Sequence, residues 1–251
     1  MNSRRTWTRE ELIVAFNLYC KVPFSKINSK NKLIIELSSA LNRTPSAVAW
    51  KLANFASLDP SLKSRNIEGA MNCSKLDRLV FDEFYQNWDA LVGESEDIIV
   101  NKFKIQDSEK LFQYRDGKVK AQVINVRLNQ SFFRKAILAS YNSRCCITGL
   151  NIPELLIASH IVPWSIDEKN RLNPENGLCL NSIHDTAFDC GLITIDLDYK
   201  VKLSQYLYDF ETDPAFQKFF KAYEHKTIEI PKKFLPKKEF LEFHQNNIFK
   251  L

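Results

Sequence analysis

The chain has 251 residues, of which 45% are hydrophobic and 26% are charged, and its formal net charge is +5; these values are typical of a soluble globular protein with one or two domains. It lacks any run of 18 apolar residues, and no apolar segment follows the charged start, so we expect neither a membrane span nor a secretory signal. Six cysteines are too few for a secreted disulfide scaffold, which favours reduced thiols and a cytoplasmic location.

Three helical patterns fill the first sixty residues. Thr8 and Glu11 have the spacing of a capping box before the first helix, and Thr44 precedes Pro45 at the start of the third. This segment resembles the Myb/SANT-like helix-turn-helix group, because a tryptophan near the start is followed by T-x-E-E and then by the R-T-x-x-A-V run that opens the third helix. We therefore predict a helical bundle over residues 1–65.

The charge of this segment points to nucleic acid. Residues 1–65 hold eleven Lys or Arg against four acids, an excess expected of a DNA-binding surface. The resemblance implies that the third helix enters the major groove of double-stranded DNA, and a small protein-interaction module is the alternative. The residues predicted to face DNA are Arg43, Ser46, Trp50, Lys51 and Asn54.

The middle of the chain has the pattern of a connector. Residues 75–91 form an amphipathic helical pattern, and the following residues, 92–118, are acidic and only weakly periodic. We therefore interpret residues 66–118 as a helical linker region. The next run, KAQVINVRL, predicts a short strand, and NQSFFRKAILASYNSR predicts a helix.

Histidine and asparagine then recur at fixed spacing. His160 lies inside the apolar run LLIASHIVPW, Asn176 opens NGLCL sixteen residues later, and His184 begins a helix eight residues after that. A lone histidine on an apolar strand is usually a packing residue, but this order resembles the HNH nuclease family, which folds as two antiparallel strands and a helix around one divalent metal. The resemblance extends over residues 119–251 through SFFRKAILASYNSRCCITGL, RLNPENGLCL, HDTAFDCGLITID and FLPKKEFLEFH, and it favours the restriction-associated branch.

The resemblance implies a role for each of the three residues. His160 is the expected general base, since a neutral imidazole can take a proton from water near neutral pH. Asn176 is expected to hydrogen-bond across the loop and orient the strand that carries the base. His184 is the expected metal ligand on the helix.

The same resemblance implies an acidic ligand at Asp189, since Mg²⁺ and Mn²⁺ prefer oxygen. His184 and Asp189 are five residues apart, which does not place them on one face of an ideal helix, so Asp185 is the alternative ligand. Ser159 occupies the position before the general base, where many family members have an acid or a histidine that binds the metal. We expect one divalent ion, Mg²⁺ or Mn²⁺, with Ser159 as a weak ligand.

Other residues complete the predicted site. Cys146 and Cys179 lack the partners of C-x-x-C pairs, so we expect no structural zinc. Arg134 and Arg171 are predicted phosphate contacts, because a guanidinium matches phosphate oxygens. His244 lies on an amphipathic helix and is predicted to be structural.

The whole pattern predicts an α+β protein, with a three-helix bundle over 1–65, a linker over 66–118 and an HNH domain with a ββα-metal finger over 119–251. The implied function is metal-dependent DNA cleavage that leaves a 5′-phosphate and a 3′-hydroxyl, in the setting of bacterial restriction. One finger cuts one strand, so cleavage of both strands implies a homodimer or two successive events. The alternatives are a DNA-binding or regulatory protein with a decayed HNH unit, and a nuclease toxin.

Overall fold

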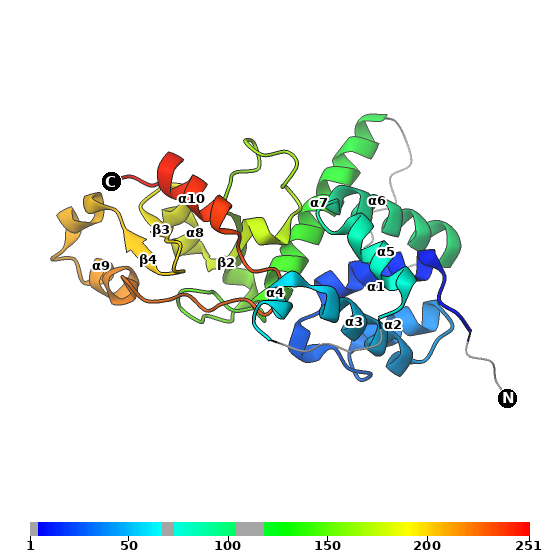
Figure 1. Cartoon of the computed structure of the whole chain (residues 1–251). Helices are drawn as coiled ribbons and strands as arrows, with labels where there is room; N and C mark the ends of the chain where they lie inside the picture. The colour runs from blue at the N-terminus through cyan, green and yellow to red at the C-terminus, as the bar shows by residue number, and fades with distance from the viewer. Residues whose placement is uncertain (1–4, 67–72, 104–117) are drawn as a thin grey trace. The chain divides into compact units, whose positions relative to one another are not determined.

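The chain folds into two compact units, Met1–Ala136 and Ile137–Leu251. The computed structural model describes residues 5–66, 73–103 and 118–251 (Figure 1). None of the helices in these three segments combines the length and the apolar character that a membrane span requires. The combination of a helical first unit with small antiparallel sheets in the second confirms the predicted α+β class.

The first unit is helical throughout its described residues. The predicted caps are present: Thr8 and Glu11 form a capping box, and the Thr44 side chain accepts from the amide of Ala47. Its helices are α1 (Arg9–Lys21), η1 (Phe24–Lys26), α2 (Lys32–Ala40), α3 (Pro45–Leu58), α4 (Pro60–Lys63), α5 (Lys75–Phe84), α6 (Trp88–Ile98), the π-helical η2 (Ile99–Phe103) and α7 (Lys118–Ser140), which continues into the second unit.

Helices α5 and α6 belong to the core of the first unit, whereas the sequence predicted a linker there. The ring centre of Phe16 on α1 lies 5.0 Å from that of Phe55 on α3 and 5.2 Å from that of Phe81 on α5. It lies 6.2 Å from the ring centre of Trp88. All four side chains are buried. The apolar stripe of α5 therefore completes a core with α1 and α3, and the bundle is larger than the three helices predicted.

Helix α7 replaces the predicted strand KAQVINVRL. The predicted strand and the helix pattern after it form one continuous helix over Lys118–Ser140. No proline or glycine occurs between residues 118 and 140 to interrupt the backbone hydrogen bonds. The β-branched residues of the run therefore extend the helix that follows them.

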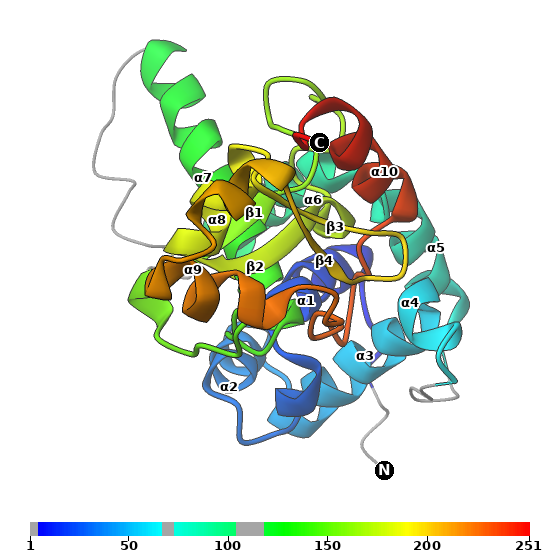
Figure 2. The ribbon, with the colours of Figure 1, turned by 90° about the vertical axis from the view of Figure 1, so that its left-hand side faces the viewer.

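The second unit contains the predicted strand-strand-helix order. Strand β1 (Leu156–His160) pairs with β2 (Gly177–Asn181) antiparallel, with Ala158 opposite Cys179 and His160 opposite Gly177. Helix α8 (Ser182–Asp189) follows β2 directly and packs on both strands, as Figure 2 shows. Its other elements are η3 (Pro153–Leu155), η4 (Pro174–Asn176), β3 (Ile193–Ile195), β4 (Val201–Leu203), η5 (Gln205–Phe210), α9 (Pro214–Phe219), η6 (Lys221–Tyr223) and α10 (Lys238–Asn247).

The end of α8 and the C-terminal residues meet at Gly191. This residue has φ +71°, and a Cβ there would lie 2.1 Å from the carbonyl oxygen of Ile248. The amide of Lys250 donates to the Gly191 carbonyl at 3.0 Å. Glycine therefore allows the chain after α10 to lie against the end of α8, and this places Ile248 beside the site described next.

Candidate active site

A cavity of about 440 Å³ lies beside β1 in the second unit. Its walls are formed by β1 with the loop that follows it, by Asp185 and Asp189 of α8, and by His244 and Ile248 near the C-terminus. Trp164 is half-buried and also lines this cavity. The cavity therefore combines two imidazoles, two carboxylates and an apolar wall.

His160 is the last residue of β1, and its ring has a defined tautomer. Its Nε2 lies 2.9 Å from the carbonyl oxygen of Arg171. A carbonyl oxygen only accepts, so Nε2 carries the hydrogen and Nδ1 carries the lone pair. Burial lowers the pKa of His160 below 6.5, and the Arg171 carbonyl opposes this in part. The ring is therefore neutral near pH 7, with a basic nitrogen in a lined cavity.

Asn176 is completely buried and connects the loop after β1 to the start of β2. Its Oδ1 accepts from the amide of Val162 at 2.8 Å, and its Nδ2 donates to the Val162 carbonyl at 3.1 Å. The same Nδ2 donates to the Asn170 carbonyl at 3.3 Å, and the Asn176 carbonyl accepts from Ile161 at 3.0 Å. The asparagine thus holds the two residues that follow His160.

Asp185 and Asp189 lie four residues apart on α8 and both line the cavity. Burial and, to a smaller extent, the charge of Asp185 together raise the pKa of Asp189 to about 6. Burial also raises the pKa of Asp185, although the Ser159 hydroxyl opposes this. Positions i and i+4 share one helix face, so the two carboxylates lie on the same side of α8.

This pair of carboxylates suits a hard divalent cation. Mg²⁺ keeps several water ligands and needs only one or two protein carboxylates, and Asp185 with Asp189 supplies them. The Ser159 hydroxyl in the same wall is buried and, among the described residues, has no hydrogen-bond partner at normal distance. Within those residues, no three His, Cys, Asp or Glu side chains come together as a metal site. The donor set therefore fits an ion held by two carboxylates and water.

The structure corrects the expectation for His184, which is buried but does not line the cavity. Its Nε2 lies 2.8 Å from the Phe219 carbonyl, and its Nδ1 lies 3.1 Å from Oδ1 of Asn181. The ring also packs edge-on against Phe220 and Tyr223. One residue along a helix turns the side chain by about 100°, so His184 faces the α9–η6 segment while its neighbour Asp185 faces the cavity.

His244 forms part of the cavity wall as a fully bonded side chain. Its Nδ1 accepts from the Thr194 hydroxyl at 2.8 Å, and its Nε2 donates to the Phe188 carbonyl at 3.1 Å. The ring stacks on Phe188 with 3.7 Å between ring centres. Burial lowers the pKa of His244 to about 4. This geometry agrees with the predicted structural role.

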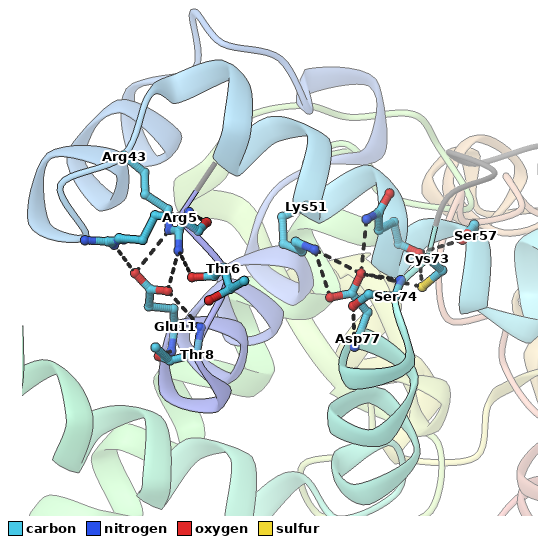
Figure 3. A network of polar contacts seen from close by, with 11 residues as sticks. Arg5, Thr6, Thr8, Glu11, Arg43, Lys51, Ser57, Cys73, Ser74 and Asp77 are labelled. Atoms are coloured by element: carbon cyan, nitrogen blue, oxygen red, sulfur yellow. Dashed lines mark hydrogen bonds and ion pairs between the residues drawn. The ribbon is translucent and has the colours of Figure 1, made fainter. Parts of the chain in front are cut away.

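In the first unit, the side chain of Arg43 is buried in an ion-pair network (Figure 3). Its guanidinium pairs with Glu11 at 2.8 Å and donates to the Thr6 carbonyl at 2.7 Å. It also lies over the ring of Trp7, 4.1 Å from the centre. Arg43 is thus occupied within the bundle, which corrects its prediction as a DNA contact.

Lys51 and Asn54 are also corrected, because α5 covers this side of α3. The Lys51 ammonium lies 2.9 and 3.0 Å from the two carboxylate oxygens of Asp77 (Figure 3). Asn54 donates to the same carboxylate at 3.1 Å. Both side chains are buried. Ser46 and Trp50 remain exposed on α3, with Trp50 at 59% exposure.

Part of the basic charge of residues 1–65 is paired with acids of later helices in the unit. Arg9 pairs with Glu83 and Glu94, and Lys51 pairs with Asp77. Arg43 instead pairs with Glu11 within residues 1–65, and Lys102 pairs with Glu10. The charge asymmetry along the sequence therefore reflects packing of the bundle as well as any outside partner.

The two arginines predicted to contact phosphate have different surroundings. Arg134 is exposed on α7. Arg171 is half-buried, and its Nε donates to the Trp164 carbonyl at 2.9 Å.

The cysteines are free thiols. The buried Cys146 and Cys179 are joined through their backbones, because the Cys146 amide donates to the Cys179 carbonyl at 2.7 Å.

Comparison with known families found a match, and it lies within the unit that contains this cavity. Residues 145–196 match the family model described as HNH endonuclease. The matched residues include β1, β2 and α8, and so they include His160, Asn176, Asp185 and Asp189. A search for similar curated proteins found no match. The match supports the predicted HNH family and nuclease activity over part of the predicted 119–251 domain.

Proposed function

We propose that this HNH unit makes the chain a DNA endonuclease in which His160 is the general base. One observation carries the proposal: the ring of His160 is held through Nε2 by the Arg171 carbonyl, in the cavity that Asp185 and Asp189 also line. The geometry supplies a lone pair at Nδ1 and two carboxylates for a cation in the same cavity. A general base and a divalent cation each accelerate phosphodiester hydrolysis at neutral pH.

His160 acts on water in this proposal. Burial keeps the imidazole neutral, so Nδ1 takes a proton from the water that attacks the phosphorus atom. The bond from phosphorus to the 3′ oxygen breaks, and that oxygen gains a proton from solvent. The products are a 5′-phosphate and a 3′-hydroxyl. Asn176 acts by positioning, because it fixes the residues directly after His160.

Asp185 and Asp189 are the residues proposed to hold Mg²⁺ or Mn²⁺, with Ser159 in the same cavity wall. When bound, a divalent cation would neutralise charge on the phosphoryl oxygens and stabilise the leaving oxygen. The two carboxylates on one face of α8 and the raised pKa of Asp189 support this assignment. Asp185 replaces His184 in the ligand set, and this is the principal change from the expectation.

Double-stranded DNA is the proposed substrate, and restriction of foreign DNA is the proposed setting. On the protein surface, the exposed Ser46, Trp50 and Arg134 remain the proposed contacts. Trp50 offers an aromatic face, and Arg134 offers a charge for phosphate. A single finger cuts one strand, so we propose that a homodimer cuts both.

A plasmid assay tests the proposal. Supercoiled DNA is incubated with the purified chain and Mg²⁺ or Mn²⁺, and sequencing of the cut ends identifies the termini. We expect cleavage that His160→Ala abolishes. His225→Ala is the matched control, since His225 is a solvent-exposed histidine outside the cavity. Intact supercoiled DNA with the wild-type chain and both ions, under conditions where the chain still binds DNA, would support a decayed unit instead.

A further inference from the structure

The loop after β1 returns to His160 through Arg171. The backbone carbonyl of Arg171 accepts from Nε2 of the His160 ring at 2.9 Å. In the same residue, the guanidinium Nε donates to the Trp164 carbonyl at 2.9 Å. One residue therefore fixes the His160 ring with its backbone and the beginning of the loop with its side chain.

Trp164 completes this arrangement. Its indole lies edge-on to the His160 ring, with 5.6 Å between ring centres and 89° between ring planes. The guanidinium of Arg171 lies over the same indole, 5.3 Å from the ring centre. His160, Trp164 and Arg171 therefore contact one another pairwise.

Two of the three guanidinium nitrogens of Arg171 already have partners within the loop. Nε donates to the Trp164 carbonyl, Nη2 donates to the carboxylate of Glu168 at 2.8 Å, and the Arg171 side chain is 28% exposed. A phosphate contact through either of these nitrogens would require the guanidinium to exchange a contact within the loop. The backbone of Asn170 is also held, because its carbonyl accepts from Asn176.

We propose that Arg171 is a positioning residue. Its guanidinium holds the 164–171 loop through the Trp164 carbonyl, and this clamp keeps the backbone carbonyl of Arg171 in place to accept the hydrogen on Nε2 of His160. The expected effect of Arg171 on cleavage rests on the proposed function. Its expected effect on the His160 tautomer does not, because that effect exists with or without substrate. Loss of the clamp lets the loop carbonyl move, and the ring then populates the tautomer with hydrogen on Nδ1. That tautomer presents no lone pair at Nδ1.

Two substitutions separate positioning from a phosphate contact, because they change the donor and the charge in opposite directions. Arg171→Gln loses the charge but keeps an N–H donor at the same distance along the side chain as Nε. Arg171→Lys keeps the charge but places a methylene group at that position. A positioning role therefore tolerates glutamine and not lysine, and a phosphate contact tolerates lysine and not glutamine.

The first measurement is spectroscopic and needs no cleavage. The chain has four histidines, so selective ¹⁵N labelling gives few ring signals, and His160→Ala identifies those of His160. At a pH where the imidazole is neutral, the ¹⁵N shifts report which nitrogen carries hydrogen. We expect the Nε2–H form in the wild type and in Arg171→Gln, and a mixture of the two forms in Arg171→Lys. Arg171→Met lacks both the donor and the charge, and we expect it to show the same mixture as Arg171→Lys. It takes the place of Arg171→Lys if the lysine variant does not fold.

The second measurement is steady-state cleavage. Arg171→Lys is expected to lower kcat by about 10–100-fold with KM unchanged, as for other groups that orient a functional histidine. Arg171→Gln is expected to retain kcat within roughly fivefold, since one neutral hydrogen bond contributes about 1 kcal/mol. Lys169→Ala is the matched control, since its side chain is exposed on the same loop, and we expect no change in the tautomer.

Three results would overturn the inference. One is an unchanged His160 tautomer in both Arg171→Lys and Arg171→Met. Another is a wild-type ring with hydrogen on Nδ1. The third is a raised KM in Arg171→Gln with normal cleavage by Arg171→Lys, which assigns the guanidinium to phosphate. A wild-type chain that does not cleave DNA refutes the proposed function alone, because the tautomer measurement still decides the role of Arg171.

Discussion

Replacing Asp189 by asparagine removes one of the two carboxylates in the cavity. Burial and the charge of Asp185 raise the pKa of Asp189 to about 6, above its ordinary value of 3.8. A group with a folded-state pKa above the unfolded value favours the folded state only when protonated, so ionised Asp189 costs stability. This cost is complete above about pH 6 and absent below 3.8. We therefore expect Asp189→Asn to be more stable than the wild type at pH 7 without divalent cations.

The size of the gain follows from the same values. The rise from 3.8 to about 6 corresponds to about 3 kcal/mol, at about 1.4 kcal/mol for each pH unit. This is an upper limit, because Asp189 is exposed on its solvent side and water screens an exposed charge. We expect a gain of about 1 kcal/mol, which corresponds to a rise in Tm of about 2–4 °C.

The assay is thermal unfolding in EDTA at pH 7 and pH 5, repeated at pH 7 with Mg²⁺ or Mn²⁺. The advantage of Asp189→Asn should be full at pH 7 and clearly smaller at pH 5, where the wild-type carboxyl is mostly protonated in the folded state. The cations should raise the Tm of the wild type and reduce or reverse the difference, because they bind the folded state through both carboxylates. Asp198→Asn, an exposed carboxylate outside the cavity, is the control.

The reasoning is refuted if Asp189→Asn is less stable than the wild type at pH 7 in EDTA, or if its advantage grows as the pH falls. Equal stabilisation of both proteins by the cations would remove Asp189 from the proposed ligand set. Loss of cleavage in Asp189→Asn together with a gain in stability would show that the protein accepts a destabilising charge because the reaction needs it.

Other substitutions test the packing around the site and in the bundle. Lys51→Met leaves the buried Asp77 carboxylate without its cation, so we expect a loss of about 3–5 kcal/mol in the free energy of unfolding, measured with urea; a loss under about 1 kcal/mol would contradict the buried pair. Gly191→Ala places a Cβ against the Ile248 carbonyl at positive φ, so Tm should fall by the equivalent of about 1–3 kcal/mol, and an unchanged Tm would contradict this close approach. The pKa of His244 is lowered from 6.5 to about 4, so its imidazole binds a proton more tightly in the unfolded protein than in the folded protein. The wild type should therefore lose up to about 3 kcal/mol as the pH falls from 6.5 to 4, and its stability advantage over His244→Asn should shrink across that window; a constant difference would show that the ring does not titrate as described.

Much of the second unit could be predicted from short-range patterns. The apolar run before His160 and the NGLCL run both form strands, and the capping residue Asn181 begins α8. Strand pairing then brings His160 opposite Gly177, next to Asn176. These features follow from residues close together in the sequence.

The proposed ligand set was harder to predict, because it depends on the direction of side chains around α8. His184 and Asp185 are neighbours in the sequence, yet one packs on Phe219 and the other lines the cavity. The spacing of Asp185 and Asp189 was a usable signal, since positions i and i+4 share a face. The family pattern drew attention to the histidine instead.

The bundle shows the same limit over longer separations. Arg43, Lys51 and Asn54 have the composition and spacing of a DNA-reading helix face. The sequence alone does not reveal that Glu11 lies across from Arg43, or that Asp77, twenty-six residues after Lys51, reaches that lysine. The polar residues that predicted an outside partner are instead used to join the helices of one unit.

The amino-acid sequence by itself determined the α+β class, the helix caps, the strand-strand-helix order and the placement of His160 at a strand end, because capping, periodicity and spacing act over a few residues. Only the tertiary structure decided which polar side chains are buried pairs, which carboxylates meet in the cavity and which nitrogen of His160 carries the hydrogen. Those outcomes depend on contacts between distant segments, where a single turn of a helix changes which group a side chain meets.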